Sequence, residues 1–355
     1  MAIRTRVFVP LLCLVLGLGL GTVWLIQWNS RPVPVEPLEY FTRVFDKFAP
    51  KHLPFKHKSV ADALKGITIV TVAYKKISAL KTVLRSWKRH GLLDLGGEKL
   101  AWIQKVGVAD ISKRQAEVLK HAGFRVVNED PSKMVTACLG DSARANRMVA
   151  DRVASDGNVG IGPAVAYMVC ATKDEFFLLL EPDFQLIQPW QDVTDHLFKA
   201  AMLLREHNVH AVRFRSRFAS GYPNWAEIGS NDADVDWMDP QLRCMAYHWI
   251  PDVLDRYPDV FARCPPVLPA DYLEYVCVQS LNCGWTNNPV MMASSAFLKS
   301  PLYGAAERCN MEMDKQDNHC FERSVVENGN LWRNLNYTVA LGAGLFSHME
   351  PGCGG

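Results

Sequence analysis

This chain lacks the sequence signatures of several common nucleotide-binding and metal-binding folds. No Gly-x-Gly-x-x-Gly motif follows its first expected strand, and no Walker A sequence occurs anywhere in its 355 residues. Hydride transfer from a dinucleotide and P-loop chemistry therefore lose their main support. The absence of any Cys-x-x-Cys pair likewise argues against a structural zinc site.

An excess of charge of either sign is also missing. The chain carries 39 Lys and Arg against 37 Asp and Glu, a formal net charge of +2, so nothing favours a nucleic-acid partner. Low-complexity segments and internal repeats are absent too. With 49% hydrophobic residues, the part of the chain beyond the N-terminal region can bury a sizeable core.

The N-terminal region predicts attachment to a membrane. Residues 7–30 carry no charge and are long enough to cross a hydrocarbon layer of about 30 Å as a helix. Arg4 and Arg6 precede them, so the positive-inside rule puts the N-terminus in the cytosol and the rest of the chain in a lumen or outside the cell. We expect an uncleaved type II signal anchor, with a cleaved signal peptide as the alternative.

The expected organisation follows from this anchor. It comprises a cytosolic tail at 1–6, a transmembrane anchor at 7–28, a proline-rich stem at 29–62 and a lumenal catalytic domain at 63–355, divided into a nucleotide-binding half at 63–185 and an acceptor-binding half at 186–355. Ten cysteines fit an oxidising compartment and predict several disulfide bonds. Asn336 begins a glycosylation sequon, which is consistent with a lumenal location.

The first half of the catalytic domain alternates between strand and helix patterns. Strands are expected at 67–74, 99–106 and 124–127, and helices at 77–93 and 112–122, with Ser112 as the helix cap. Such an order predicts a parallel sheet with right-handed crossovers. Further along we expect a helix at 160–172, strands at 209–215 and within 284–293, a helix from Ser294, and a strand or loop after residue 338. The predicted fold class is α/β, with a mixed, mostly parallel sheet flanked by helices.

The most informative stretch is the apolar run 176–180, which is bounded by charge on both sides. It predicts a strand buried on both faces. Pro182 ends the strand, and Glu181 and Asp183 can then point at one spot beyond its carboxyl end, where open α/β sheets bind ligands. Clustered carboxylates suit Mg²⁺ or Mn²⁺, although such a pair can also serve as a helix cap or as solvated loop residues.

Three residues near the C-terminus are further candidates. Asp317 can cap a helix, or it can act as a general base that takes a proton from a hydroxyl nucleophile, with Asp314 as the alternative base. His348 can complete the metal site or touch phosphates, although a lone histidine is more often structural.

Together these features resemble the GT-A class of nucleotide-sugar glycosyltransferases, over roughly residues 67–350. Residues 176–184 look like the hydrophobic strand that ends in the Asp-x-Asp motif of that class, here in the form Glu181-Pro182-Asp183. The Glu-x-Asp form is similar to that of Golgi N-acetylglucosaminyltransferases such as the GlcNAc-transferase I group. The resemblance implies that Asp183 holds Mn²⁺ (or Mg²⁺) and that Glu181 contacts the ribose or a metal-bound water.

The same resemblance implies roles for other positions. Val72, Ala73 and Tyr74 would face the uridine, and Glu129 or Asp130 would line the nucleotide pocket. Asp317 falls where inverting members carry Glu-Asp before a helix, but Gln316 departs from that pattern. His348, in Leu-Phe-Ser-His, resembles the C-terminal histidine of many members.

The expected function is metal-dependent transfer of a hexose or N-acetylhexosamine from a nucleotide sugar, a UDP-sugar by preference, to a hydroxyl of a glycan or glycoprotein, with inversion favoured over retention. The protein would be a single-pass type II membrane protein of the Golgi (or ER). One alternative is a non-catalytic lumenal protein, derived from a glycosyltransferase, that binds glycans or scaffolds other enzymes. Another is a lumenal hydrolase, which needs acids flanking a sugar without nucleotide binding.

Overall fold

The computed structural model describes residues 60–74, 76–104, 109–127, 160–221, 240–248, 250–267, 274–286, 289–305, 325 and 331–349. All of these lie in one compact unit, Thr42–Gly355. The expected anchor and stem up to residue 59, and with them Glu129, Asp130, Asp314 and Asp317, lie outside the described residues. None of the helices within the described ranges is both long enough and apolar enough to cross a bilayer.

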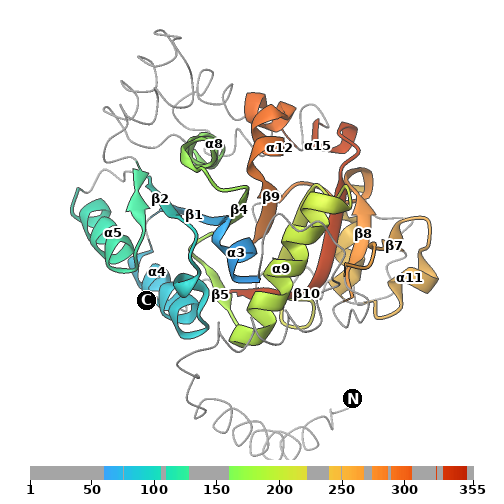
Figure 1. The fold of residues 1–355 in the computed structure, drawn as a ribbon, viewed down its shortest axis with the longest axis horizontal. Coiled ribbons are helices and arrows are strands. Elements are labelled where there is room, and N and C mark those ends of the chain that lie inside the picture. Colours follow the sequence, from blue (N-terminus) through green and yellow to red (C-terminus); the bar gives the residue numbers. More distant parts are fainter. Residues whose placement is uncertain are drawn as a thin grey trace, which may run out of the picture. The chain divides into compact units, whose positions relative to one another are not determined.

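The described strands form one sheet with helices on both sides (Figure 1). Its order is β3-β2-β1-β4-β9-β6-β10-β8-β7, with β5 paired to β10 off this path. The strands are β1 Ile67–Ala73, β2 Lys99–Ile103, β3 Arg125–Val126, β4 Phe176–Leu179, β5 Phe184–Leu186, β6 Ala211–Arg215, β7 Phe261–Arg263, β8 Val276–Gln279, β9 Val290–Ala293 and β10 Thr338–His348. The helices are α3 Val60–Lys65, α4 Ile77–Arg89, η1 Leu92–Asp94, α5 Ala109–His121, α8 Ile161–Ala171, α9 Trp190–Glu206, η4 Pro240–His248, α11 Val253–Arg256, η5 Ser280–Asn282, α12 Ser294–Lys299 and α15 Leu331–Asn334.

Parallel pairing is confirmed throughout the first half of the sheet. There β3, β2, β1 and β4 pair in parallel, as predicted from the alternation of strands and helices. In the second half β9 runs antiparallel to both β4 and β6, and β8 runs antiparallel to β10 and β7. β6 and β10 pair in parallel again. The sheet is therefore mixed but not mostly parallel, because β5, β8 and β9 each follow the previous strand without an α-helix between them in the described residues.

The strands that carry the candidate site all run in one direction. β1 and β4 are parallel, β9 reverses between β4 and β6, and β6 and β10 are parallel again. The carboxyl ends of β1, β4, β6 and β10 consequently lie at the same edge of the sheet. That edge is the usual ligand-binding edge of open α/β sheets.

The period of two along each buried strand divides the core into two layers. Ile67 and Ile69 of β1 pack with α4, α5 and α9, whereas Val70 and Val72 pack on the other face with α8 and α12. β4 also contributes to both layers. All four of its residues are buried, and successive side chains enter opposite cores. The apolar run predicted as a doubly buried strand is thus confirmed.

One helix boundary was predicted wrongly. α5 begins at Ala109, so Ser112 lies inside the helix and does not cap it. Half-buried Ile111 and buried Gln115 continue the inward-facing side of the helix toward its start. The Ser112 hydroxyl is buried and has no hydrogen-bond partner among the described residues.

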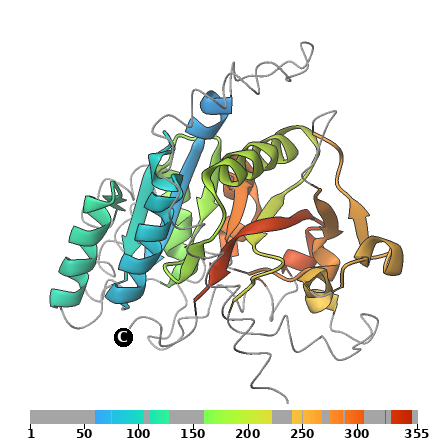
Figure 2. The same cartoon turned by 90° about the horizontal axis from the view of Figure 1, so that it is seen from below.

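The long strand β10 changes partners along its length. On one side its first part pairs with β8 and its last residues pair with β5. On the other side it pairs with β6, with a shift in register between Leu341 and Phe346. Gly344 has φ +78°, and a Cβ there would stand 2.2 Å from the carbonyl oxygen of Arg215. This position therefore needs glycine for both its backbone angle and its space. Figure 2 shows β10, in red, bending along its length.

Two disulfide bonds hold the second half of the sheet together, which confirms that cysteines here are oxidised. Cys264 pairs with Cys277, and Cys244 in η4 pairs with Cys283 just after η5. The sequence separations of 13 and 39 residues correspond to about 3 and 4 kcal/mol in the chain-entropy model. Cys170 is also disulfide-bonded.

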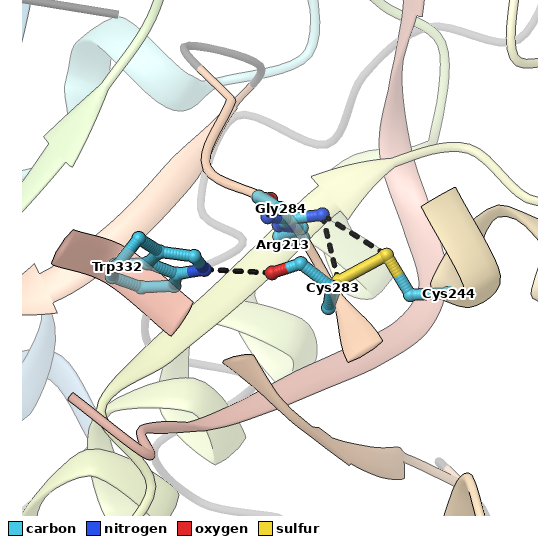
Figure 3. The surroundings of a disulfide bond; sticks show 5 residues. All are labelled: Arg213, Cys244, Cys283, Gly284 and Trp332. Atoms are coloured by element: carbon cyan, nitrogen blue, oxygen red, sulfur yellow. Dashed lines mark hydrogen bonds between the residues drawn. A yellow bond between two sulfur atoms is a disulfide. The ribbon is translucent and has the colours of Figure 1, made fainter. Parts of the chain in front are cut away.

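Half-buried Arg213 lies against the Cys244–Cys283 disulfide (Figure 3). Its Nη1 is 3.0 Å from the Cys283 sulfur, and its Nη2 donates to the carbonyl of Gly284. The indole of Trp332 donates to the carbonyl of Cys283 at 2.6 Å. Burial lowers the pKa of the Arg213 guanidinium to about 10, which leaves it charged at neutral pH.

We expect Gly344→Ala to destabilise the protein more than Gly123→Ala. Both glycines have positive φ, and alanine costs about 1 kcal/mol for that backbone angle at either position. At 344 the new Cβ would also clash with the backbone of Arg215, whereas at 123 its nearest neighbour is 3.9 Å away. A further loss of about 2 kcal/mol at 344 should appear in urea unfolding. Equal losses at the two positions would contradict this account of the bend.

Candidate active site

Asp183 and His348 meet although they lie far apart in the sequence. After β4 the chain turns at Glu181, whose carbonyl accepts a hydrogen bond from the N–H of Phe184 at 3.2 Å. β5 then pairs antiparallel with the end of β10, so that Phe184 lies opposite His348. This register brings Asp183 Oδ2 to 3.5 Å from His348 Nε2.

Backbone contacts hold both residues of this pair. The N–H of Met349 donates to the Asp183 carbonyl at 2.8 Å, and the N–H of His348 donates to the Ser220 carbonyl at 3.2 Å. The imidazole of His348 also packs edge-on against the ring of Phe184, with centroids 4.6 Å apart. Because these contacts fix the main chain at both residues, they also fix the positions from which the two side chains extend.

Arg215 supports His348 from the end of β6. Its guanidinium donates to the carbonyls of Ser220 and Gly221 at 2.8 and 3.3 Å, and Gly221 forms an isolated bridge with His348. A Cβ at Gly221 would lie 1.9 Å from the His348 carbonyl oxygen, so only glycine fits there. The sequence analysis did not identify this support.

Helix α4 anchors the other strand. The indole of Trp87 donates to the carbonyl of Phe184 at 2.9 Å, and the Ser86 hydroxyl accepts from the N–H of Leu186 at 3.1 Å. Trp87 is fully buried. The turn that presents Asp183 therefore lies between the buried face of α4 and the end of β10.

The bend of β10 lies against a buried pair of side chains. A Cβ at Gly342 would come within 2.7 Å of the Tyr275 ring, which shows how closely this ring packs on the strand. The Tyr275 hydroxyl lies 2.8 Å from His196 Nδ1. Burial, with a smaller contribution from the charge of Lys199, lowers the pKa of His196 to about 4.

Lys76 also approaches Asp183. It follows β1 and precedes α4, and its Nζ lies 3.9 Å from Asp183 Oδ2. Its backbone has φ 24° and ψ 57°, a left-handed conformation that is unusual for lysine. The sequence analysis missed this residue, because its proximity to Asp183 depends on two strands that are neighbours only in the folded sheet.

The local charges keep Asp183 ionised. Burial alone would raise the pKa of its carboxyl group. The hydrogen bond from His348 and the charges of His348 and Lys76 together outweigh that effect, so its pKa lies below the ordinary value of 3.8. At neutral pH the site therefore presents a carboxylate.

The pair has the properties expected of a partial metal site. Asp183 Oδ1 and His348 Nδ1 are buried and have no hydrogen-bond partner among the described residues. Two cis ligands of an octahedral ion stand about 3 Å apart, close to the 3.5 Å between Oδ2 and Nε2. Within the described ranges no group of three or more His, Cys, Asp or Glu side chains is placed to hold a metal ion.

The expected nucleotide-binding residues differ in whether their side chains are exposed. The side chains of Val72 and Ala73 are buried, one in each of the two cores. Tyr74 is 40% exposed at the carboxyl end of β1, so it is the one of these three whose side chain can contact a ligand. Half-buried Glu181 lies in the same turn as Asp183. Glu129, Asp130, Asp314 and Asp317 remain predictions outside the described residues.

Comparison with known proteins gives only distant structural similarity. No protein-family model and no curated protein matches the sequence. The chain is similar to glucosyl-3-phosphoglycerate synthase from Mycobacterium tuberculosis in complex with Mn²⁺, UDP-glucose and phosphoglyceric acid, with 12% identity over 85% of this chain and 79% of that one and a TM-score of 0.40. The same enzyme with Mn²⁺, UDP and glucosyl-3-phosphoglycerate is 11% identical over 82% of this chain and 77% of that one, with a TM-score of 0.39. A mycobacterial protein without a stated activity is 14% identical over 84% of this chain and 73% of that one, with a TM-score of 0.38.

We expect His196 to make the protein less stable in acid. Its pKa is about 4 in the folded protein and 6.5 when unfolded, so between these values only the unfolded chain takes up a proton. The free energy of unfolding should therefore fall from pH 6.5 to pH 4, by at most about 3 kcal/mol for this group. His196→Gln should reduce that slope in urea unfolding.

The exposed His121 provides the matched control, and His121→Gln should leave the slope unchanged. Part of the slope should survive in His196→Gln, because burial and the charges of Arg215 and Arg213 also lower the pKa of His248 to about 4. If His196→Gln shows the full acid slope of the original protein, the buried imidazole is not the source.

Proposed function

We propose that this chain is a metal-dependent glycosyltransferase that moves a hexose or N-acetylhexosamine from a UDP-sugar to a hydroxyl of a glycan or glycoprotein. The observation that carries the proposal is the meeting of Asp183 and His348 at the carboxyl edge of the sheet. A carboxylate and an imidazole whose Oδ2 and Nε2 lie 3.5 Å apart at that edge are suited to a cation that a diphosphate also contacts.

Each residue of the edge has a role in this proposal. Asp183 and His348 hold the cation, which would neutralise the charge of the departing diphosphate. Tyr74 offers an exposed aromatic ring for the nucleoside base, and Glu181 is close enough in the chain to contact the ribose. Glu129 or Asp130 would line the same pocket.

The acceptor side of the reaction is assigned from sequence. Asp317 would take the proton of the acceptor hydroxyl as that oxygen attacks the anomeric carbon, and Asp314 is the alternative base. Attack from the face opposite the diphosphate gives inversion. Membership of the GlcNAc-transferase I group is part of the same proposal.

The proposed setting is the lumen of the Golgi or ER, with residues 7–28 as a membrane anchor. The disulfides Cys244–Cys283 and Cys264–Cys277 support a location in an oxidising compartment.

We expect Asp183→Asn to lower sugar transfer by about 100-fold or more, because the neutral amide cannot neutralise or orient the cation. Release of UDP from a panel of UDP-sugars in the presence of Mn²⁺ measures the effect. Asp255→Asn, at an exposed carboxylate on α11, is the matched control and should retain full activity.

Thermal shift gives an independent reading of the same site. UDP with Mn²⁺ should raise the melting temperature of the original protein but not that of Asp183→Asn. Normal turnover by Asp183→Asn would remove this residue from the mechanism. If the original protein neither turns over any nucleotide sugar nor responds to UDP with Mn²⁺, the non-catalytic glycan-binding alternative is favoured.

A further inference from the structure

The carboxylate of Asp183 has an uneven set of neighbours. Its Oδ2 faces both His348 Nε2 at 3.5 Å and Lys76 Nζ at 3.9 Å, whereas its Oδ1 has no hydrogen-bond partner within the described ranges. The ammonium group therefore lies next to an oxygen that the proposed cation needs. Two positive charges cannot share that oxygen without repelling each other.

The backbone of Lys76 makes this lysine unusual. Among the described residues, positive φ outside glycine occurs at Lys76, Asn208 and Asn336. Asparagine tolerates left-handed backbone because its side chain hydrogen-bonds locally, but lysine gains no such compensation, and the conformation costs about 1–3 kcal/mol. A glycine or asparagine would be cheaper here, which points to a use for the lysine side chain.

The backbone of Lys76 is held in place, whereas its side chain is free to change conformation. Its carbonyl accepts the N–H of Leu80 at 3.1 Å, so the backbone is tied to the first turn of α4. That turn contains no acidic residue, and no side chain caps it. The Lys76 side chain is 65% exposed and can therefore move while the backbone stays in place.

On the premise of the proposed function, we propose that Lys76 is a mobile counter-ion within the donor site. Its ammonium group balances Asp183 before the donor binds. When the cation takes the Asp183 oxygen, repulsion displaces the ammonium group, and the diphosphate offers it new negative oxygens nearby. The Lys76 ammonium group thus competes with the cation for the Asp183 carboxylate and then helps to bind the nucleotide diphosphate.

This role predicts effects of opposite sign on two ligands. Removing the ammonium group removes a competitor, so Mn²⁺ alone should bind more tightly. The same change removes a contact to the diphosphate, so UDP in saturating Mn²⁺ should bind more weakly. A lysine that only maintained the local structure would shift both affinities in the same direction or in neither.

The experiment compares Lys76→Met with the original full chain. Mn²⁺ binding without nucleotide is measured by electron paramagnetic resonance, and UDP binding in saturating Mn²⁺ by calorimetry. We expect the Kd of Mn²⁺ to fall about 3- to 5-fold, the effect of one partly exposed charge pair, and the Kd of UDP to rise about 10-fold, the effect of one charge-assisted hydrogen bond.

Two further variants make the test specific. Lys76→Arg keeps the charge and should restore UDP binding to within about 3-fold of the original protein. Lys81→Met removes an exposed charge on α4 and should change neither Kd. Lys76→Asn, which relieves the backbone, should show the same opposite shifts as Lys76→Met and guards against a folding defect in the latter.

The outcomes separate this inference from the function on which it rests. If the original protein binds Mn²⁺ and UDP but Lys76→Met leaves both Kd values unchanged or moves them in the same direction, the role of Lys76 is wrong and the proposed function stands. If the original protein binds neither ligand, both fail. Opposite shifts, with restored UDP binding in Lys76→Arg, support the counter-ion.

Discussion

The pairing of β5 with the end of β10 is the constraint on which the candidate site depends. β5 is only three residues long, yet its register sets Phe184 opposite His348 and so brings Asp183 to the imidazole. Trp87 and Ser86 hold this short strand from one side. Arg215, through the backbone of Ser220 and Gly221, holds β10 from the other.

Glycine makes that pairing possible. β10 must leave β8 and turn toward β5 while it keeps β6 as its other neighbour, which requires positive φ at Gly344 and close contact with Tyr275 at Gly342. Packing then fixes the bend, because the Tyr275 ring and His196 fill the space behind it. The geometry of two polar side chains thus depends on apolar and backbone contacts that carry no charge.

Local patterns in the sequence were sufficient for the first half of the fold. The strand β1 and the doubly buried run in β4 come from residue types alone, and α8 follows its expected range closely, whereas α4 ends at Arg89, short of the expected 93. The antiparallel placement of β9 was not predictable in this way, because a four-residue apolar strand is equally compatible with either direction.

The candidate site was predictable only in part. The acids after β4 follow from the position of Pro182. His348 was one of three candidates near the C-terminus, and a family resemblance supported it, but no local pattern connected it with Asp183. Val72 and Ala73 were placed in the right strand, although their side chains point into the cores. Lys76 and Arg215 escaped notice because their contacts join strands that no local pattern connects. The assembled pair has a consequence for quality control in the cell. Since Asp183 and His348 are supplied by segments that become neighbours only when the last strand docks, a chain whose second half has misfolded would carry no working site.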